Sequence, residues 1–180
     1  FKQESGDTLT LKERIDGHFM ASIATVKVSY DNREKLLTEF NKYFEESVKN
    51  PSFKYKSVII KGSNEKSNIE GLIQLFNRNQ ISYSYAGNTG KKLKGFDYIL
   101  NKEGEVTIEK GDILISAYQP ESHFIQVLFE PDSRATDSLS YDLTAWALPY
   151  VYNLKAYALT EKITPDVADV SGSHGGAKLH

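Results

Sequence analysis

Apolar residues recur at helical spacing in several segments of this chain, separated by polar stretches. Helices are predicted over residues 9–20, 32–48, 66–79 and 120–129. Asp31 is placed to cap the second of these helices, whereas Gly17 is unfavourable inside the first. The segment 21–30 is rich in β-branched residues, and it could form a strand or continue the first helix.

Short apolar runs bounded by polar residues predict strands. The predicted strands cover residues 57–60, 81–85 and 113–117. The first two flank the helix predicted over residues 66–79, and this order is typical of a βαβ unit with parallel strands and a right-handed crossover. Residues 96–100 and 106–108 flank a turn with Gly104, which predicts a β-hairpin. The pattern therefore predicts an α/β protein.

The segment Tyr141–Glu161 concentrates aromatic residues and contains the only Trp of the chain. Asp142 can cap a helix over residues 143–152, Asn153 can end it, and residues 155–160 alternate like a strand. A large aromatic side chain removes about 150–250 Å² from water when it is buried. We therefore expect this segment to form a core or an interface, with Trp146 largely buried.

Length and composition narrow the possible functions. The 180 residues suit one domain, and the net charge of -2 gives no reason to expect nucleic acid as a partner. The absence of Cys excludes disulfides, thiolate zinc sites and a cysteine nucleophile. No apolar segment approaches the roughly 18 residues of a membrane span, so we expect no integral membrane protein. Because the chain begins at Phe1, we expect a fragment or a processed product.

Four sequence stretches carry a resemblance to a known family. They are DLTAWALPYVYNLKAYAL from Asp142, AYQP from Ala117, VLFEPD from Val127 and TLTLKERIDGHFMASIATV from Thr8. Together they resemble a region of large bacterial zinc carboxypeptidase-family proteins. In those proteins the region follows the peptidase domain and looks like a class I glutamine amidotransferase domain.

The resemblance implies a fold and a division of the chain. It implies a three-layer α/β domain with a mostly parallel central sheet, similar to amidotransferase and flavodoxin-like folds, together with the inserted hairpin and an N-terminal helical segment. Residues 1–20 would connect to an upstream domain, residues 21–163 would form the accessory domain, and residues 164–180 would be a tail or linker. The partner would be the upstream peptidase domain, which would hold the zinc, in a periplasmic or secreted protein.

The residues themselves offer little catalytic chemistry. Neither His18, His123 nor His174 is followed by Glu at the third position, so the His-x-x-Glu zinc pair of carboxypeptidases is missing. The turn AYQP has neither Ser nor Cys where an amidotransferase places its nucleophile. The Gly- and Lys-rich stretch 87–92 lacks the spacing of a phosphate-binding loop. Asp132, Asp137 and Asp142 lie near one another in the sequence, and two of them could form a catalytic pair of carboxylates, although a capping role suffices for Asp142.

The leading hypothesis is a non-catalytic accessory domain that acts in interdomain packing or substrate positioning. The alternatives are a module that binds a glycan or peptidoglycan fragment through a Tyr-rich face, and an independent carboxylate hydrolase. No catalytic residue, metal ligand or cofactor is assigned to this chain, and peptide or glycan are the ligands considered. The candidate ligand or interface residues are Tyr118, Gln119, His123, Asp142, Trp146 and Tyr150. His123 could be a surface or capping residue or a base.

Overall fold

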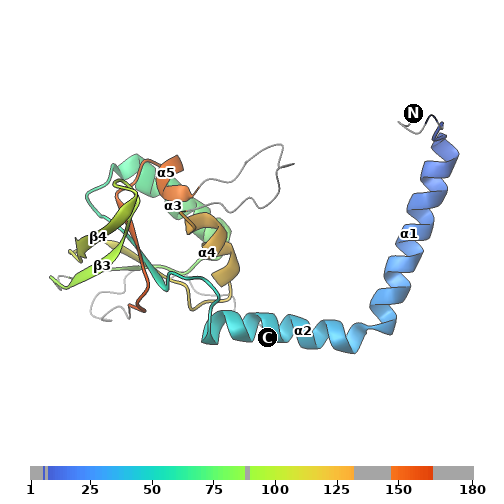
Figure 1. Cartoon of the computed structure of the whole chain (residues 1–180), viewed down its shortest axis with the longest axis horizontal. Helices are drawn as coiled ribbons and strands as arrows, with labels where there is room; N and C mark the ends of the chain where they lie inside the picture. Colours follow the sequence, from blue (N-terminus) through green and yellow to red (C-terminus); the bar gives the residue numbers. More distant parts are fainter. Residues whose placement is uncertain (1–5, 7, 88–89, 132–146, 164–180) are drawn as a thin grey trace. The chain divides into compact units, whose positions relative to one another are not determined.

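The computed structural model describes residues 6, 8–87, 90–131 and 147–163. The chain divides into two compact units, Phe1–Phe44 and Glu45–His180, and the strands all belong to the second. The course of the chain is followed by colour in Figure 1. Sequence predictions for Asp142 and Trp146 lie outside the described residues.

Two helices follow one another at the start of the chain. The first, α1 (Leu11–Asp31), begins with a capping box in which the Thr10 hydroxyl accepts from the Glu13 N–H and the Glu13 carboxylate accepts from the Thr10 N–H. Residues 21–30 continue this helix and form no strand. The second, α2 (Arg33–Lys49), confirms the helix predicted over residues 32–48. The predicted domain boundary between residues 20 and 21 lies inside α1 and stays a prediction.

One open sheet forms the centre of the second unit. In the described part of the chain its strands are β1 (Ser57–Ile60), β2 (Ser84–Tyr85), β3 (Lys92–Asp97), β4 (Lys102–Thr107), β5 (Ile113–Ser116) and β6 (Ala156–Leu159). Their order is β2-β5-β1-β6-β3-β4, and every neighbouring pair is antiparallel. The predicted mostly parallel sheet of the amidotransferase or flavodoxin-like type is therefore wrong.

The position of β5 explains why the prediction of a parallel pair failed. Strands β1 and β2 run in the same direction and are joined through α3 (Lys66–Arg78), but β5 lies between them and is antiparallel to both. In the same way, β1 lies between β5 and β6, whose connection contains α4 (Ser122–Phe129) and α5 (Leu148–Val151). Two interleaved split βαβ units result, β1-α3-β2 and β5-α4-α5-β6, an arrangement also seen in ferredoxin-like sheets, and the β3–β4 hairpin is inserted between them in the chain.

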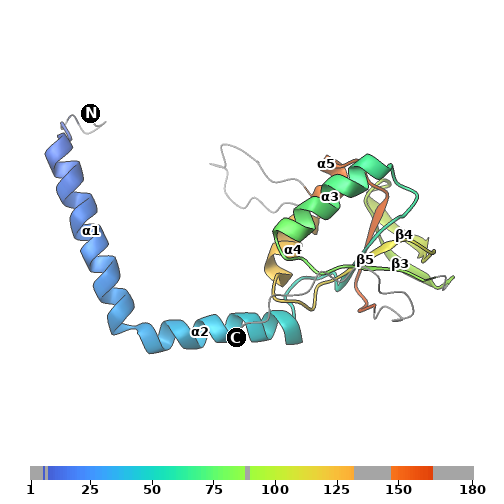
Figure 2. The same ribbon diagram turned by 180° about the vertical axis from the view of Figure 1, so that it is seen from behind.

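The two faces of the sheet are covered differently. Helices α3, α4 and α5 lie together on one side of it, where Leu72, Phe76 and Phe129 pack into the larger core cluster (Figures 1 and 2). On the other face, Ile59 and Leu114 pack with apolar residues of the β3–β4 hairpin and its flanks, and no helix of the described part contributes to that cluster. The predicted three-layer arrangement, with helices on both faces, is therefore wrong as well.

The inserted hairpin is present, but its turn differs from the prediction. The Asp97 carboxylate accepts from the N–H groups of Ile99 and Leu100 at 2.8 and 3.1 Å, so the turn follows Asp97 and Gly104 lies within β4. Gly95 lets β3 approach β6 closely. A Cβ atom at Gly95 would lie 2.8 Å from the Ala158 carbonyl oxygen, which leaves no room for a larger residue.

Tyr98 links the hairpin to the helical layer. Its side chain is buried, and its hydroxyl donates to the backbone carbonyl of Phe129 at the end of α4. Burial, reinforced by the neighbouring phenols of Tyr150 and Tyr55, raises the pKa of Tyr98 far above its ordinary value. The folded chain therefore keeps this phenol neutral at a pH at which the unfolded chain releases the proton.

We expect the free energy of unfolding to fall as the pH rises above about 10, the ordinary pKa of a tyrosine. The sign follows because the folded state holds the Tyr98 proton more tightly than the unfolded state, so rising pH favours unfolding. Urea unfolding at about pH 8 and about pH 11 measures the loss. Tyr98→Phe should cost about 1 kcal/mol at the lower pH but should reduce the loss at the higher pH. An equal loss in both proteins would contradict the assignment to Tyr98.

Candidate functional site

The turn after β5 is the place where the sequence predicted a strand-to-helix junction. Strand β5 ends at Ser116, and α4 begins at Ser122, two residues later than the predicted start at Pro120. The hydroxyl of Ser116 accepts a hydrogen bond from the N–H of Tyr118 at 3.2 Å. Tyr118 is half-buried and Gln119 is buried, so the two candidate residues of this turn point into different surroundings.

Gln119 binds backbone and extends the pairing of two strands. Its Oε1 accepts from the N–H of Ser82 at 2.7 Å, and its Nε2 donates to the carbonyl oxygens of Ser82 and Ser116 at 3.0 and 2.7 Å. Ser82 and Ser116 continue the register in which Ser84 faces Leu114. The amide therefore takes the place of ladder hydrogen bonds where β2 and β5 separate. It is a positioning group, and a ligand role for Gln119 stays a prediction.

A cavity of about 320 Å³ lies beside this turn, within the second unit. It is lined by Val48, Ser57, Ser82, Tyr83, Ser84, Leu114, Ile115, Ser116, Tyr118, Gln119, Pro120 and Ile163. Ser57 faces Ser116 and Ser84 faces Leu114 in the ladder, so these side chains share one face of the sheet. The cavity thus combines an apolar base with several small hydroxyl groups, which is a composition common among small-ligand and peptide sites.

The far wall of the cavity is the segment that follows β6. The hydroxyl of Ser57 accepts from the N–H of Ile163 at 2.8 Å and fixes this segment against β1. Lys162, which precedes Ile163, is exposed, and its Nζ lies 4.1 Å from the centre of the Tyr118 ring. This cation–π contact orients the Tyr118 ring at the cavity. The site therefore carries one positive charge close to an aromatic wall.

The remaining predicted residues lie elsewhere. His123 is half-buried on α4 and is not among the residues that line the cavity. Tyr150 lies on α5, where its ring contacts the Tyr98 ring at 5.5 Å and its hydroxyl donates to Asn101 at 3.2 Å. Asp142 and Trp146 lie outside the described residues, as do Asp132 and Asp137. Of the four candidates that the structure describes, Tyr118 and Gln119 are the two that line the cavity.

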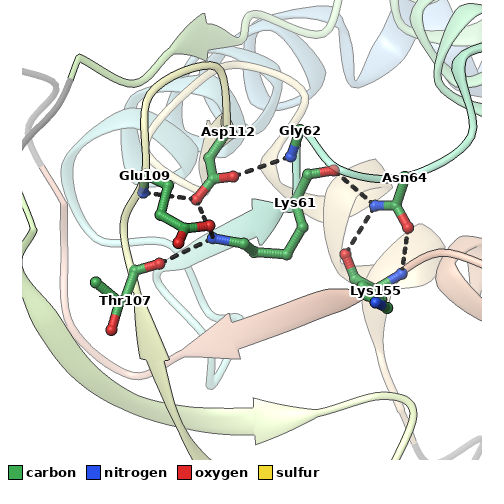
Figure 3. A network of polar contacts seen from close by, with 7 residues as sticks. All are labelled: Lys61, Gly62, Asn64, Thr107, Glu109, Asp112 and Lys155. Carbon is green, nitrogen blue, oxygen red and sulfur yellow. Dashed lines mark hydrogen bonds and ion pairs between the residues drawn. The ribbon is translucent and has the colours of Figure 1, made fainter.

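A second polar cluster lies at the opposite end of β1 and β5, and no motif in the sequence predicted it. Asp112 is buried and accepts from the N–H groups of Gly62 and Glu109, each at 2.9 Å (Figure 3). Its carboxylate also lies 2.6 Å from Nζ of Lys61, which further donates to the Thr107 carbonyl at 2.9 Å. This one carboxylate joins residues 61–62 to the loop of residues 109–112.

Lys61 completes the cluster with an ion pair of 2.9 Å to the exposed Glu109. Burial lowers the pKa of Lys61, but the bonds to Asp112 and Glu109 outweigh it, and the net pKa is raised. Nearby, the amide of Asn64 donates to the Lys155 carbonyl and accepts from the Lys155 N–H (Figure 3). Because these groups bind one another and backbone, the cluster fastens loops and offers no site for a ligand.

Two further findings concern the described residues only. They contain no group of three or more His, Asp or Glu side chains placed to hold a metal ion. No helix in the ranges 8–87, 90–131 and 147–163 is both long enough and apolar enough to cross a membrane. Comparison of the chain with family models, curated proteins and solved structures finds no match.

Proposed function

We propose that this chain is a non-catalytic accessory domain of a zinc carboxypeptidase-like protein and that α1 and α2 dock against the peptidase domain. The peptidase partner, its zinc and a periplasmic or secreted location come from the sequence resemblance. In this proposal the parent protein removes C-terminal residues from peptides, and the chain serves interdomain packing or substrate positioning. The support from the structure comes from the surface of the two helices.

The observation that carries the proposal is the exposure of apolar side chains on α1 and α2. Helix α1 has no buried residue, and Ser47 is the only buried residue of α2. Leu37 and Phe40, on the apolar face of α2, are 59% and 61% exposed. The exposed large apolar residues of the two helices are Leu11, Ile15, Phe19, Met20, Ile23, Val26, Val28, Tyr30, Leu36, Leu37, Phe40, Tyr43, Phe44 and Val48. Helices in proteins gain most of their stability from packing such a face.

The extent of this surface fits a stable interface. At about 150–250 Å² for each large aromatic side chain, the aromatic residues among them alone expose roughly 500 Å², and the aliphatic residues add to this area. A standard protein–protein interface buries about 800 Å² on each partner. A single exposed apolar residue would need no explanation, but a surface of this size on two consecutive helices is typical of a partner-binding face.

The proposal is tested by titrating the chain with a peptidase domain from a protein of the resembled family, in an isothermal calorimetry experiment. We expect saturable binding that Phe40→Asp weakens at least about tenfold, because a charge then replaces an apolar contact in the interface. Thr38→Asp is the matched control, since it places the same charge on the opposite face of α2. Thr38→Asp should bind like the wild type.

Two results would overturn the proposal. The first is the absence of binding between the chain and the peptidase domain at concentrations of about 100 µM. The second is binding that responds equally to Phe40→Asp and Thr38→Asp, because the apolar face would then have no special part in it. Circular dichroism of both variants establishes that the helical content is unchanged.

A second candidate function is the binding of a glycan or peptidoglycan fragment. It is favoured by the cavity beside β5, where the Tyr118 ring and the hydroxyls of Ser82 and Ser84 line the same space. Aromatic rings and hydroxyl groups are suited to sugar rings. Calorimetry with a neutral chitooligosaccharide tests this alternative, and a signal that Tyr118→Ala abolishes would support it over simple interdomain packing.

A further inference from the structure

We infer that the outer edge of β2 binds an extended peptide by strand addition, with an apolar side chain of that peptide in the cavity beside β5. The residues involved all belong to the second unit, and among the residues that line the cavity only Val48 lies on α2. It assigns a use to the edge strand and the cavity together.

Strand β2 turns some of its backbone N–H and C=O groups toward β5 and the others away from it. The N–H of Ala86 donates to the Asp112 carbonyl at 2.7 Å, and the Ala86 carbonyl accepts from the Gly111 N–H at 2.9 Å. Ser84, two residues earlier, faces Leu114 in the same ladder. Since alternate residues of a strand turn their hydrogen-bonding groups to opposite sides, those of Tyr83 and Tyr85 are directed away from β5.

The strand is held in this conformation beyond its two ladder residues. Gln119 binds both backbone groups of Ser82, and Ala86 binds residues 111 and 112, so residues 82–86 are fixed at both ends along β5. The outward N–H and C=O groups of Tyr83 and Tyr85 are therefore presented in fixed positions. A partner pays less in lost conformational freedom when the receiving strand is already ordered.

The two edges of the described sheet differ in their protection. At the other edge, β4 carries Lys102, Glu103 and Glu105, and charged residues are a common means of blocking edge pairing. The segment 82–85 at the β2 edge reads Ser-Tyr-Ser-Tyr and has no charge and no proline. The β2 edge thus lacks the charges that discourage strand addition at β4.

The cavity supplies a place for a side chain of the added strand. Ser82 and Ser84 form its wall on the β2 side, and Leu114 and Ile163 contribute apolar surface further in. Because serine is small, this wall is low, and a Leu, Val or Phe side chain of a peptide lying along β2 can reach across it. Binding of backbone at the edge and of alternate side chains in pockets is the usual form of strand addition.

An extended peptide is the occupant that this surface fits best. Donors and acceptors that alternate along Tyr83 and Tyr85 match another peptide backbone, whereas a sugar or a lipid chain has no such regular alternation. The apolar base of the cavity selects a peptide with apolar residues at every second position. A neutral or mildly acidic sequence is preferred, since Lys162 places a positive charge against the Tyr118 ring, which lines the cavity.

The test uses fluorescein-labelled pentapeptides in which Val, Leu or Phe alternates with Ser, titrated with the whole chain in a fluorescence polarisation assay. We expect saturable binding of at least one of these peptides. Tyr85→Pro removes an outward N–H and leaves the bonds of Ser84 and Ala86 to β5 in place, so it should weaken binding at least tenfold. Tyr85→Ala is the matched variant, which loses the ring but keeps the N–H, and its affinity should change less than about threefold.

A change on the peptide side keeps the test decisive if Tyr85→Pro does not fold. Methylation of a peptide nitrogen whose N–H would donate to β2 should abolish binding to the unaltered chain. Methylation of the next nitrogen, whose N–H points away from β2, should not. The inference is overturned if no peptide binds or if both methylated peptides bind equally. It is also overturned if Tyr85→Pro and Tyr85→Ala both fold and bind the peptide with the same affinity. Dimers of the chain that dissociate in Tyr85→Pro, without peptide binding, would also overturn it.

Discussion

Replacing Asp112 by Ala is expected to lower the free energy of unfolding by about 3–5 kcal/mol, the range for removing one partner of a buried ion pair. Asp112 is 1% exposed, and its carboxylate accepts hydrogen bonds from Lys61, Gly62 and Glu109. Without the carboxylate, the N–H groups of Gly62 and Glu109 lose the acceptor that the buried Asp112 supplies, and Lys61 keeps only the exposed Glu109 and one carbonyl. Water cannot replace these bonds at a buried position without cost.

Urea unfolding of the wild type and variants, followed by far-UV circular dichroism at pH 7, measures this loss. Asp112→Asn should cost less, about 1–3 kcal/mol, because its carbonyl oxygen still accepts a hydrogen bond although the charge is gone. Glu70→Ala is the control. It removes an exposed i,i+4 pair with Lys66 on α3 and should change stability by less than about 0.5 kcal/mol. Equal losses for Asp112→Ala and Glu70→Ala would show that the cluster does not fasten the fold.

The helices and several strands could be predicted from the sequence because their signals are local. The apolar spacing that predicted helices over residues 32–48 and 66–79 is confirmed by α2 and α3. The run Val58-Ile59-Ile60 also predicted a buried strand correctly, and all three residues are buried. Each such signal depends on neighbours in sequence, whose spacing is fixed by the geometry of a helix or strand.

The relative direction of the strands could not be predicted from the sequence, because it depends on pairing between residues that are far apart in the chain. A strand-helix-strand order looks the same whether the two strands pair directly or receive a third strand between them. A continuous apolar run such as that of β1 is also typical of strands in parallel sheets, which are buried on both faces. Here β1 is buried on both faces because helices cover one side and the hairpin residues Leu93 and Val106 pack on the other.

The candidate residues of the turn after β5 could be named from the sequence, but their contacts could not. The stretch AYQP directed attention to the turn after β5, and the cavity lies there. The pattern could not show that the Gln119 amide binds Ser82, which is 37 residues away in sequence. The pair of Lys61 and Asp112 spans 51 residues and forms no motif, so only the folded chain brings it together.

Replacing Gln119 by Glu is the second change for which we expect a large effect. Gln119 is 6% exposed, and its Nε2 donates to the carbonyl oxygens of Ser82 and Ser116. A carboxylate cannot donate, and it places a negative charge against these two oxygens in a buried position. We expect a loss of about 3 kcal/mol at pH 7, in the range for an uncompensated buried charge. The loss should include the order of β2, which Gln119 holds against β5.

The difference from the wild type should shrink as the pH falls, because a protonated carboxyl at position 119 can donate one hydrogen bond. Burial raises the pKa of a carboxyl, so this recovery should begin above the ordinary glutamate value of about 4.3. Gln126→Glu on α4 is the matched control. The Gln126 oxygen accepts from the Ser52 hydroxyl at 3.3 Å, a role that a carboxylate keeps, so its stability should change little. Urea unfolding at about pH 7 and about pH 5 measures the free energy of unfolding of both variants and of the wild type. A Gln119→Glu protein as stable as Gln126→Glu at both values would mean that the amide does not hold β2 in place.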